Sequence, residues 1–261
     1  MEKKISVLMT VFNAEKFIKE SISSILNQSY RNFELIIVDD FSKDNSSRII
    51  SSFSDDRIKF FNSQNKLGRT KALNFGLKKC SSDFIAIQDA DDISNENRLM
   101  KAAEIFENNI DIGLVCSDYE IFGEDHKKLV KTYTNYNITK FFSRLKYKNL
   151  IPHSSIMFKR DYFEKDFLYD ESYIYAQDYN LILKFLKRSK IFLIREKLVK
   201  IRNHKDNMSN AELYKTTRIK EDLRLLRLSE NYFNSNFKEA LIINFFKIKN
   251  YLKLILNKLG V

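Results

Sequence analysis

The sequence predicts an α/β protein in which a mostly parallel sheet is flanked by helices on both faces. The first observation is order, because short apolar runs alternate with amphipathic stretches along the first half of the chain. The second is that these apolar runs are nearly continuous, as in strands that are buried on both faces. The third is composition: 44% of the 261 residues are hydrophobic, with one proline and five glycines, which fits one large domain with an appendage.

The predicted strands of the first half are short runs of aliphatic and aromatic residues. The first covers residues 5–11. The start of the chain is basic and then apolar, as in a signal peptide. The apolar run is short, however, and no small-residue cleavage site follows, so we interpret the run as a strand. Further strands are expected at residues 33–38, 57–62, 84–88 and 112–118.

Between these strands, apolar residues recur at steps of three and four, which predicts amphipathic helices. In the first of them, Phe17, Ile18, Ile22 and Ile25 share one face, and in the second Ser and Asp residues suit the capping position. Helices are expected at residues 14–28, 42–53, 68–79 and 93–108.

The second half of the chain has a weaker pattern. Residues 119–149 are expected to be irregular, followed by a strand at 154–159, a helix at 178–189 and a strand at 192–201. Two long helical patterns then cover residues 213–233 and 237–261. We therefore predict a domain of residues 1–210 and a basic helical extension of residues 211–261.

The net charge of the chain indicates which classes of ligand its surface favours. The 45 Lys and Arg residues exceed the 34 Asp and Glu residues and give a net charge of +11, so the surface favours nucleic acid, anionic lipid or a nucleotide.

Cys80 and Cys116 lie in or beside apolar segments and are expected to be reduced, partly buried thiols. No apolar run reaches the roughly 18 residues of a membrane span. We therefore expect a cytoplasmic protein.

Polar residues gather where predicted strands end. Residues 10–13 follow the first strand, residues 39–40 the second and residues 89–92 the fourth. In open parallel sheets these ends share the edge at which ligands bind. Residues two apart in an extended segment point the same way, so Asp89 and Asp91 face one cleft. This pattern predicts Mn²⁺ or Mg²⁺ held by carboxylates together with the diphosphate of a sugar nucleotide.

A simpler role for the same acids is helix capping. Asp91, Asp92 and Ser94 precede a predicted helix, whose positive end favours acids and capping hydroxyls. An isolated D-x-D would be interpreted in this way. The convergence of the other strand-end groups favours the ligand site.

Six segments resemble the family-2 glycosyltransferases, inverting enzymes with the nucleotide-binding fold called GT-A. These segments are SVLMTVFNAEKFIKESISSILNQSY, FELIIVDDFSKDNS, NKLGRTKALNFGLKKCSSDFIAIQDADD, IPHSSIMFKRD, AQDYNLILKFL and RNHKDNMS. They come in the order of the family and cover nearly everything up to residue 210. The first three are highly specific in combination, and the others are looser. The resemblance implies sugar transfer from a nucleotide donor, of the type that builds bacterial surface polysaccharides.

The resemblance assigns the nucleotide to the first segments. Thr10, Phe12 and Asn13 match the first nucleotide loop. Phe12 stands where Tyr is usual, so it offers a ring for stacking on the base but no hydroxyl. Asp40 matches the acid that contacts uracil, and Asp39 sits beside it.

One departure and two basic candidates follow along the chain. Phe41 occupies a position that is often Gly, which puts the loop conformation in doubt but leaves both acids in place. Arg69 lies in the region that often supplies a basic contact to the nucleotide, and Lys71 is a second candidate.

The D-x-D motif and two histidines complete the implied donor site. Asp89 matches the acid on the ribose side, Asp91 matches the metal ligand, and Asp92 either orients the donor sugar or caps the helix. The resemblance also makes His204 a candidate for the metal or diphosphate, and His153 a residue where donor and acceptor sugars meet. A lone His is more often structural, and that alternative stays open for both.

Asp178, in AQDYN, resembles the catalytic base of the family. The alternative is an acid that interacts with the dipole of its own helix. The implied reaction is a single displacement, in which Asp178 takes the proton of an acceptor hydroxyl and the anomeric carbon inverts. The acceptor would be a glycan or a lipid-linked glycan.

Two other function classes remain open from sequence. A metal-dependent nucleotidyltransferase also uses an α/β nucleotide fold and paired carboxylates, but would release pyrophosphate. A basic nucleic-acid-binding protein would show salt-dependent retention on DNA or RNA. No nucleic-acid module is present, so nucleic acid is not an expected partner.

The last helical pattern is both apolar and basic. Residues 241, 245, 248, 252, 255 and 259 are apolar, with lysines interspersed. This helix either packs on the first domain, packs on a second copy in a homodimer, or lies on an anionic membrane surface. The last possibility would make the protein peripheral on the cytoplasmic face of the inner membrane.

Overall fold

The computed structural model describes residues 3–123, 137–162, 169–205, 207, 215–233 and 237–259. Its strands are β1 (Ile5–Val11), β2 (Phe33–Asp39), β3 (Ile58–Asn62), β4 (Phe84–Asp89), β5 (Ile93–Ser94), β6 (Ile112–Gly123), β7 (Met157–Lys159) and β8 (Lys190–Asn203). Its helices are α1 (Ile18–Leu26), α2 (Ser46–Ser51), α3 (Arg69–Lys79), α4 (Arg98–Asn108), α5 (Ile138–Leu145), α6 (Gln177–Arg188), α7 (Lys215–Tyr232) and α8 (Phe237–Leu259). Single 3₁₀ turns are η1 (His153–Ser155) and η2 (Arg160–Tyr162).

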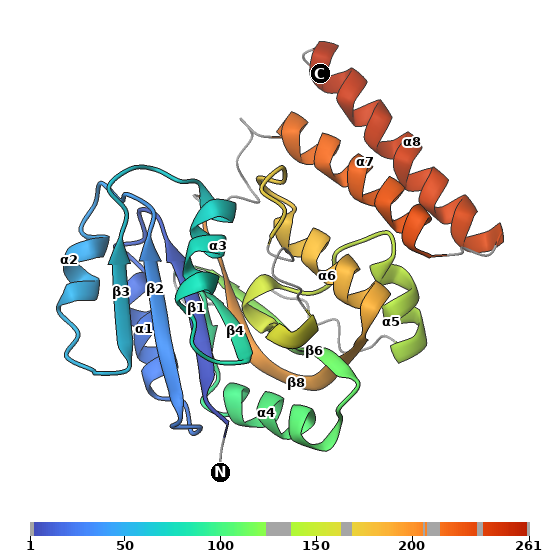
Figure 1. Cartoon of the computed structure of the whole chain (residues 1–261). Coiled ribbons are helices and arrows are strands. Elements are labelled where there is room, and N and C mark those ends of the chain that lie inside the picture. Colours follow the sequence, from blue (N-terminus) through green and yellow to red (C-terminus); the bar gives the residue numbers. More distant parts are fainter. Residues whose placement is uncertain are drawn as a thin grey trace.

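Within the described ranges, the strands form one eight-stranded sheet in the order β3-β2-β1-β4-β7-β6-β8-β5. The pairs β3–β2, β2–β1, β1–β4 and β6–β8 are parallel, whereas β7 runs antiparallel to both of its neighbours and β5 antiparallel to β8. Helices flank this sheet and a helical pair follows it (Figure 1). The predicted fold, a mixed and mostly parallel sheet between helices with a C-terminal helical extension, is confirmed.

Register aligns the ends of the first strands. In β1, Thr10 is opposite Val38 of β2 and Asp89 of β4, and Val11 is opposite Asp39. The polar residues that follow these strands therefore meet at one edge of the sheet, as parallel pairing requires.

Two apolar cores cover the faces of the sheet. Successive strand residues point to opposite faces, so Val7 and Met9 belong to the core under α1, α2 and α4, and Leu8 belongs to the core under α3, α5 and α6. Cys80 and Cys116 are both free and buried in this second core, as the sequence predicts. Burial on both faces explains why the strands read as continuous apolar runs.

Several element boundaries differ from those predicted. β6 continues to Gly123 and α5 spans Ile138–Leu145, although residues 119–149 were expected to be irregular. Residue Ile93 pairs with Lys200 of β8, so α4 begins only at Arg98 and not at residue 93. The long pairing of β6 with β8 supplies partners that no local pattern announces.

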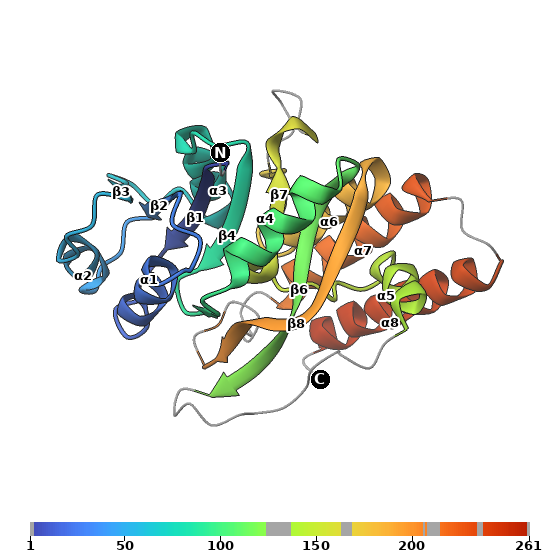
Figure 2. The same cartoon turned by 90° about the horizontal axis from the view of Figure 1, so that it is seen from below.

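The two C-terminal helices are part of the packed structure. Leu225 of α7 is fully buried against Leu183 of α6. The ring of Phe246 on α8 stacks on Tyr147, which follows α5, with 5.3 Å between centroids. Both views show α7 and α8 beside α5 and α6 (Figure 1 and Figure 2). The predicted domain boundary near Asn210 lies outside the described residues, and the division into two domains stays a prediction.

None of the described helices is long and apolar enough to cross a membrane.

Candidate active site

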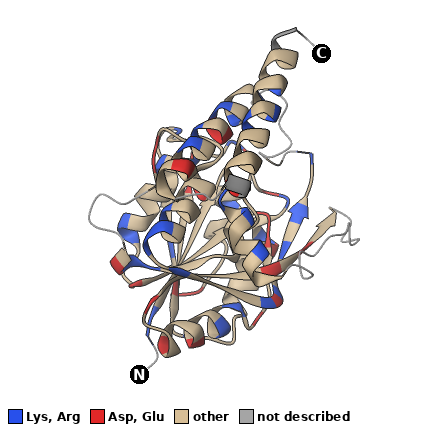
Figure 3. Ribbon diagram, turned by 90° about the vertical axis from the view of Figure 1, so that its right-hand side faces the viewer, with Lys and Arg blue, Asp and Glu red and all other residues tan. Residues whose placement is uncertain are grey.

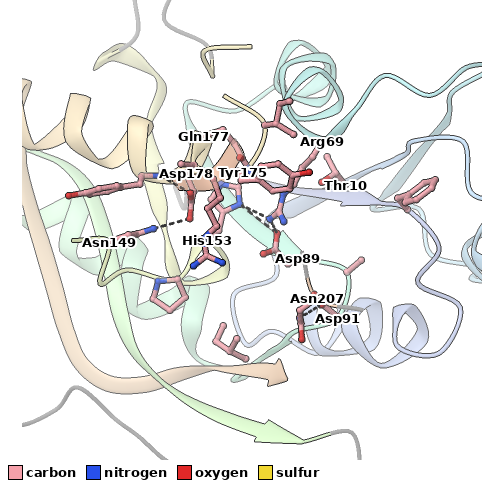
Figure 4. Close-up of a pocket in the computed structure, with 18 of the residues that line it drawn as sticks. Thr10, Arg69, Asp89, Asp91, Asn149, His153, Tyr175, Gln177, Asp178 and Asn207 are labelled. Carbon is pink, nitrogen blue, oxygen red and sulfur yellow. Dashed lines mark hydrogen bonds and ion pairs between the residues drawn. The ribbon is translucent and has the colours of Figure 1, made fainter. Parts of the chain in front are cut away.

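A cavity of about 1380 Å³ opens between the ends of the first strands and the C-terminal helices. Figure 4 shows Asp178 and Asn149 on one side of it and Asp91 on the other. Most of the predicted site residues line it, namely Thr10, Phe12, Asn13, Asp40, Arg69, Asp89, Asp91, Asp92, His153, Asp178 and His204. Asp39 and Lys71 do not.

The cavity has two sides that differ in origin. The strand-end wall lies at and after the ends of β1, β2, β3 and β4. It comprises residues 10–17, 40, 44, 66, 68, 69 and 89–92. The helical wall comprises Thr217, Arg218, Asp222, Leu226, Phe246, Lys249, Asn250 and Lys253 of α7 and α8. Residues 147–149, 152, 153, 174–179, 201, 204 and 207 complete the lining.

Asp39 is fully buried and supports a loop. Its carboxylate accepts hydrogen bonds from the backbone N–H of Ser42 at 3.1 Å and from the hydroxyls of Ser42 at 2.5 Å and of Ser47. Lys71 is exposed on α3. The structure therefore does not bring these two predicted nucleotide contacts to the cavity.

Asp40 shapes the start of α3. Its two carboxylate oxygens accept the backbone N–H groups of Leu67 at 2.5 Å and Gly68 at 3.0 Å. Burial raises the pKa of Asp40 in spite of these hydrogen bonds. Gly68 has φ +85°, a conformation that favours glycine, and the next residue is Arg69. The Asp40 carboxylate thus fixes the turn that delivers Arg69 to the site.

Asn13 and Phe41 hold the first two loops in left-handed backbone conformations, with φ of +51° and +66°. Asn13 tolerates this conformation, whereas Phe41 is strained in it, which explains why a glycine suits the position. Phe12 is 43% exposed, and the Lys66 ammonium lies 3.3 Å from its ring centroid. An aromatic face and a cation therefore stand together at this end of the cavity.

Asp89 sits between two basic groups. Its Oδ1 is 2.6 Å from an Nη of Arg69 and 3.6 Å from Nδ1 of His153. Burial alone would raise the pKa of Asp89, but Arg69 and His153 outweigh it and hold the pKa well below the usual range. The Nε2 of His153 contacts the Tyr169 hydroxyl at 2.7 Å, which fixes the ring. Asp89 is therefore ionised, and Tyr169 holds its partner His153 in place.

Asp91 and His204 meet although 113 positions separate them in the chain. The Oδ2 of Asp91 is 2.9 Å from Nε2 of His204 and accepts a hydrogen bond from Asn207 at 3.2 Å. The His204 ring packs on Phe17, with 4.6 Å between centroids. No set of three or more His, Cys, Asp or Glu side chains is grouped for metal binding among the described residues. One carboxylate and one imidazole suit a cation that takes its other ligands from a bound phosphate.

Asp92 is buried and does not cap α4. Its Oδ1 accepts the backbone N–H of Arg202 at 3.0 Å, and its Oδ2 accepts the Ser154 hydroxyl. The helix begins at Arg98, with Asn97 at its N-cap. Burial raises the pKa of Asp92 well above its usual value, and the nearby acids add to this effect. The helix-cap alternative is wrong, because the carboxylate joins η1 and β8 to the end of β4.

Asp178 lies in the first turn of α6, on the side of the cavity away from Asp91 (Figure 4). Its Oδ2 accepts a hydrogen bond from the amide of Asn149 at 3.0 Å, and its Oδ1 accepts the N–H of Tyr179 at 2.7 Å. Its charge helps to raise the pKa of Arg69, together with that of Asp89 and against the effect of burial. A carboxylate is therefore held in the cavity and within electrostatic reach of the strand-end wall.

Sequence reasoning missed several supporting residues. Arg202 and Asn207 both contact Asp91, and both lie inside the segment that was singled out for His204, so their proximity was available as a signal. Asn149 and Tyr169 lie in stretches with no motif. Nothing in the sequence indicated that α7 and α8 would line the cavity.

Comparisons with known proteins agree with this geometry. The profile described as glycosyl transferase family 2 matches residues 6–167. The Escherichia coli protein UDP-Glc:alpha-D-GlcNAc-diphosphoundecaprenol beta-1,3-glucosyltransferase WfgD is 33% identical over 195 residues, which cover 73% of this chain and 72% of WfgD. An uncharacterized glycosyltransferase of Methanocaldococcus jannaschii is 33% identical over 225 residues, which cover 80% of this chain and 76% of that protein.

Solved structures share the fold at lower identity. S. aureus TarS 1–349 in complex with UDP-GlcNAc has a TM-score of 0.72 at 20% identity, covering 95% of this chain and 71% of that one. The mannosyltransferase PcManGT from Pyrobaculum calidifontis, in complex with GDP-Man and Mn²⁺, has a TM-score of 0.68 at 17% identity, covering 97% and 72%.

The matched residues include strands β2 to β7, nearly all of β1 and the D-x-D motif, and they make up more than half of the chain. Of the function classes that the sequence left open, sugar transfer is the one that these relatives share. The chain belongs to glycosyl transferase family 2, and it is a glycosyltransferase with a GT-A fold.

Proposed function

We propose that this glycosyltransferase moves a sugar from a UDP-linked donor to a hydroxyl of a glycan or lipid-linked glycan, and that it inverts the anomeric carbon. The observation that carries the proposal is the shared cavity. The carboxylates of Asp89 and Asp91 lie on one side of it and that of Asp178 on the other. The charges of all three raise the pKa of Arg69.

The strand-end wall would bind the nucleotide. Phe12 presents an exposed ring for stacking beside the Lys66 ammonium, and the Asp40 turn brings Arg69 toward a diphosphate. Thr10 and Asn13 complete the loop. UDP is favoured as the nucleotide because WfgD is named for UDP-Glc and the TarS complex contains UDP-GlcNAc.

Asp91 and His204 would hold Mn²⁺ or Mg²⁺, the cofactor that the donor set fits. The bound cation would neutralise charge on the departing diphosphate. PcManGT, of the same fold, contains Mn²⁺ with GDP-Man, which supports this choice. Asn207, already bonded to Asp91, would keep the carboxylate in place, as outer partners of metal ligands commonly do.

Asp178 would act as the general base. The Asn149 amide holds its carboxylate in the cavity, so the carboxylate can accept the proton of an acceptor hydroxyl as that oxygen attacks. Attack from the Asp178 side is attack opposite the nucleotide on the strand-end wall. A single displacement of this kind inverts the sugar carbon, and no second carboxylate nucleophile is required.

The outer face of α8 supports a membrane-bound acceptor. Seven large apolar side chains on this helix are 43–62% exposed, namely Leu241, Phe245, Ile248, Tyr251, Leu252, Ile255 and Leu256. We call this set the apolar stripe. Such a stripe on a basic helix suits an anionic membrane surface, with the protein peripheral to it. A homodimer through α8 is the competing proposal.

A UDP-release screen tests the reaction. Purified protein would be incubated with single UDP-sugars or GDP-sugars, Mn²⁺ or Mg²⁺, and candidate acceptors, with the Asp178→Asn variant as control. We expect one donor to release UDP in a metal-dependent and acceptor-dependent way, and the product linkage to have the inverted configuration by NMR. Release from GDP-sugars alone would reject UDP as the donor nucleotide, and a retained configuration would reject the base.

A further inference from the structure

We infer that α7 and α8 form a subsite for the diphosphate of a lipid-linked acceptor, built from Arg218, Lys249 and Lys253. The inference rests on the proposed sugar transfer and names the acceptor chemistry of the same cavity. It concerns the helical wall, for which the sequence predicted no ligand.

The three basic residues line the cavity that holds Asp178. Arg218 comes from α7, and Lys249 and Lys253 come from α8. The two lysines are four residues apart, so they lie on one edge of their helix. Neither ammonium forms an ion pair with a carboxylate in the part of the chain that the structure describes. Lysines in this arrangement suit the phosphates of a ligand.

Asp222, which lines the same cavity, is influenced by both this cluster and Asp178. Burial raises the pKa of Asp222 to about 6, Arg218 and Lys253 counteract that rise, and Asp178 adds to it. The charges of the helical wall and of the proposed base therefore both act on the pKa of Asp222. An anion bound by the cations would bring its attached sugar into reach of Asp178.

The apolar stripe lies on the neighbouring face of α8. Lys249 is four residues from Phe245 and three from Leu252, so the basic edge adjoins the stripe. Figure 3 shows Lys and Arg segments along both helices. The matching ligand carries its anionic group next to a long apolar chain. A lipid diphosphate has this form, whereas a free nucleotide or a nucleic acid has no chain for the stripe.

The donor does not account for the cluster. Asp91 and Arg69 belong to the strand-end wall, and His204 contacts Asp91 there, so the donor diphosphate would lie on this side of the cavity. A second diphosphate needs its own cations, because two such groups bound side by side repel each other. The helical wall supplies these cations on the other side of the cavity.

The test measures binding of farnesyl diphosphate, a short lipid diphosphate, to the full chain saturated with UDP and Mn²⁺. The variant is Lys249→Gln/Lys253→Gln. The matched control is Lys78→Gln/Lys220→Gln, which removes the same charge from exposed positions that do not line the cavity. Farnesol serves as the ligand without phosphate. UDP affinity is measured for each protein by calorimetry.

We expect the lysine variant to lose at least about tenfold in affinity for farnesyl diphosphate, the control to match the wild type, and farnesol to show no difference among the proteins. Equal affinity of the variant and the wild type would overturn the subsite. So would an equal loss in the control, or binding that UDP abolishes. The proposed function fails by a separate result, which is the absence of UDP binding or of UDP release from any sugar nucleotide.

Discussion

The two walls of the cavity are built on different principles. On the strand-end wall, Asp40, Asp89, Asp91 and Asp92 each accept hydrogen bonds from named partners, and sheet register sets their positions. On the helical wall, Lys249 and Lys253 are exposed and project from a helix that also displays an apolar face. The first wall is preorganised for one kind of ligand. The second leaves long side chains free to adapt, which suits a bulky acceptor.

Removing the carboxylate of the proposed base, Asp178, should produce the largest difference between the two walls. Asp178→Asn keeps the shape and the Asn149 contact region but removes the proton acceptor, so turnover should fall by about 10²–10⁴-fold. UDP affinity, which depends on the strand-end wall, should stay within about twofold. Steady-state rates and calorimetry with UDP would measure both. A variant with wild-type turnover would remove Asp178 from the mechanism.

Asp91→Ala should produce the second largest difference in ligand binding between the two walls. Loss of one of two protein ligands should weaken Mn²⁺-dependent UDP binding by at least about tenfold, since even outer partners of a metal ligand contribute 10–100-fold. Binding of farnesyl diphosphate at the helical wall should be unchanged. Titration of UDP with and without Mn²⁺ would show the effect. UDP affinity that ignores both the metal and the substitution would contradict the ligand assignment.

The apolar stripe is tested by Phe245→Ser/Leu252→Ser. Each side chain is more than half exposed, so folding should be preserved, while binding to phosphatidylglycerol vesicles should fall by about tenfold or more. Ile110→Ser is the control, because Ile110 is 90% exposed and lies outside α8. Flotation with vesicles would measure binding. If the variant instead changes from dimer to monomer and vesicle binding is unaffected, the stripe is a subunit interface.

The smallest expected effect is on stability. Because burial raises the pKa of Asp222 to about 6 from its ordinary value of 3.8, the folded state binds this proton more tightly than the unfolded state. The free energy of unfolding should therefore fall as pH rises from about 4 to about 6, by between about 1 and 3 kcal/mol. Asp222→Asn should lack this fall and gain several degrees in Tm at pH 8 but little at pH 4.

Thermal unfolding of Asp222→Asn at both pH values, beside the exposed-site control Asp56→Asn, would check this. An equal gain at pH 4 and pH 8 would show that the effect is not due to ionisation of Asp222.

Sequence reasoning succeeded where local pattern and function coincide. The strands of the first half are continuous apolar runs, and the acids at their ends point to the edge that register then assembles. It failed for Asp39, whose hydrogen bonds to Ser42 and Ser47 cannot be distinguished by sequence from a ligand contact. The position of α7 and α8 was beyond prediction, because helical periodicity shows which face is apolar but not where the helix docks.

β8 gives the site a particular order of assembly. This strand carries Arg202 and leads to His204, which must reach Asp91 across 113 positions of the chain. During synthesis, the ribosome completes the first four strands long before it makes residue 204. Nucleotide binding that depends on both residues would therefore begin only after residue 204 has been made. Under the proposed function, affinity for UDP would depend on β8, and chains that end before residue 204 would bind the donor less tightly.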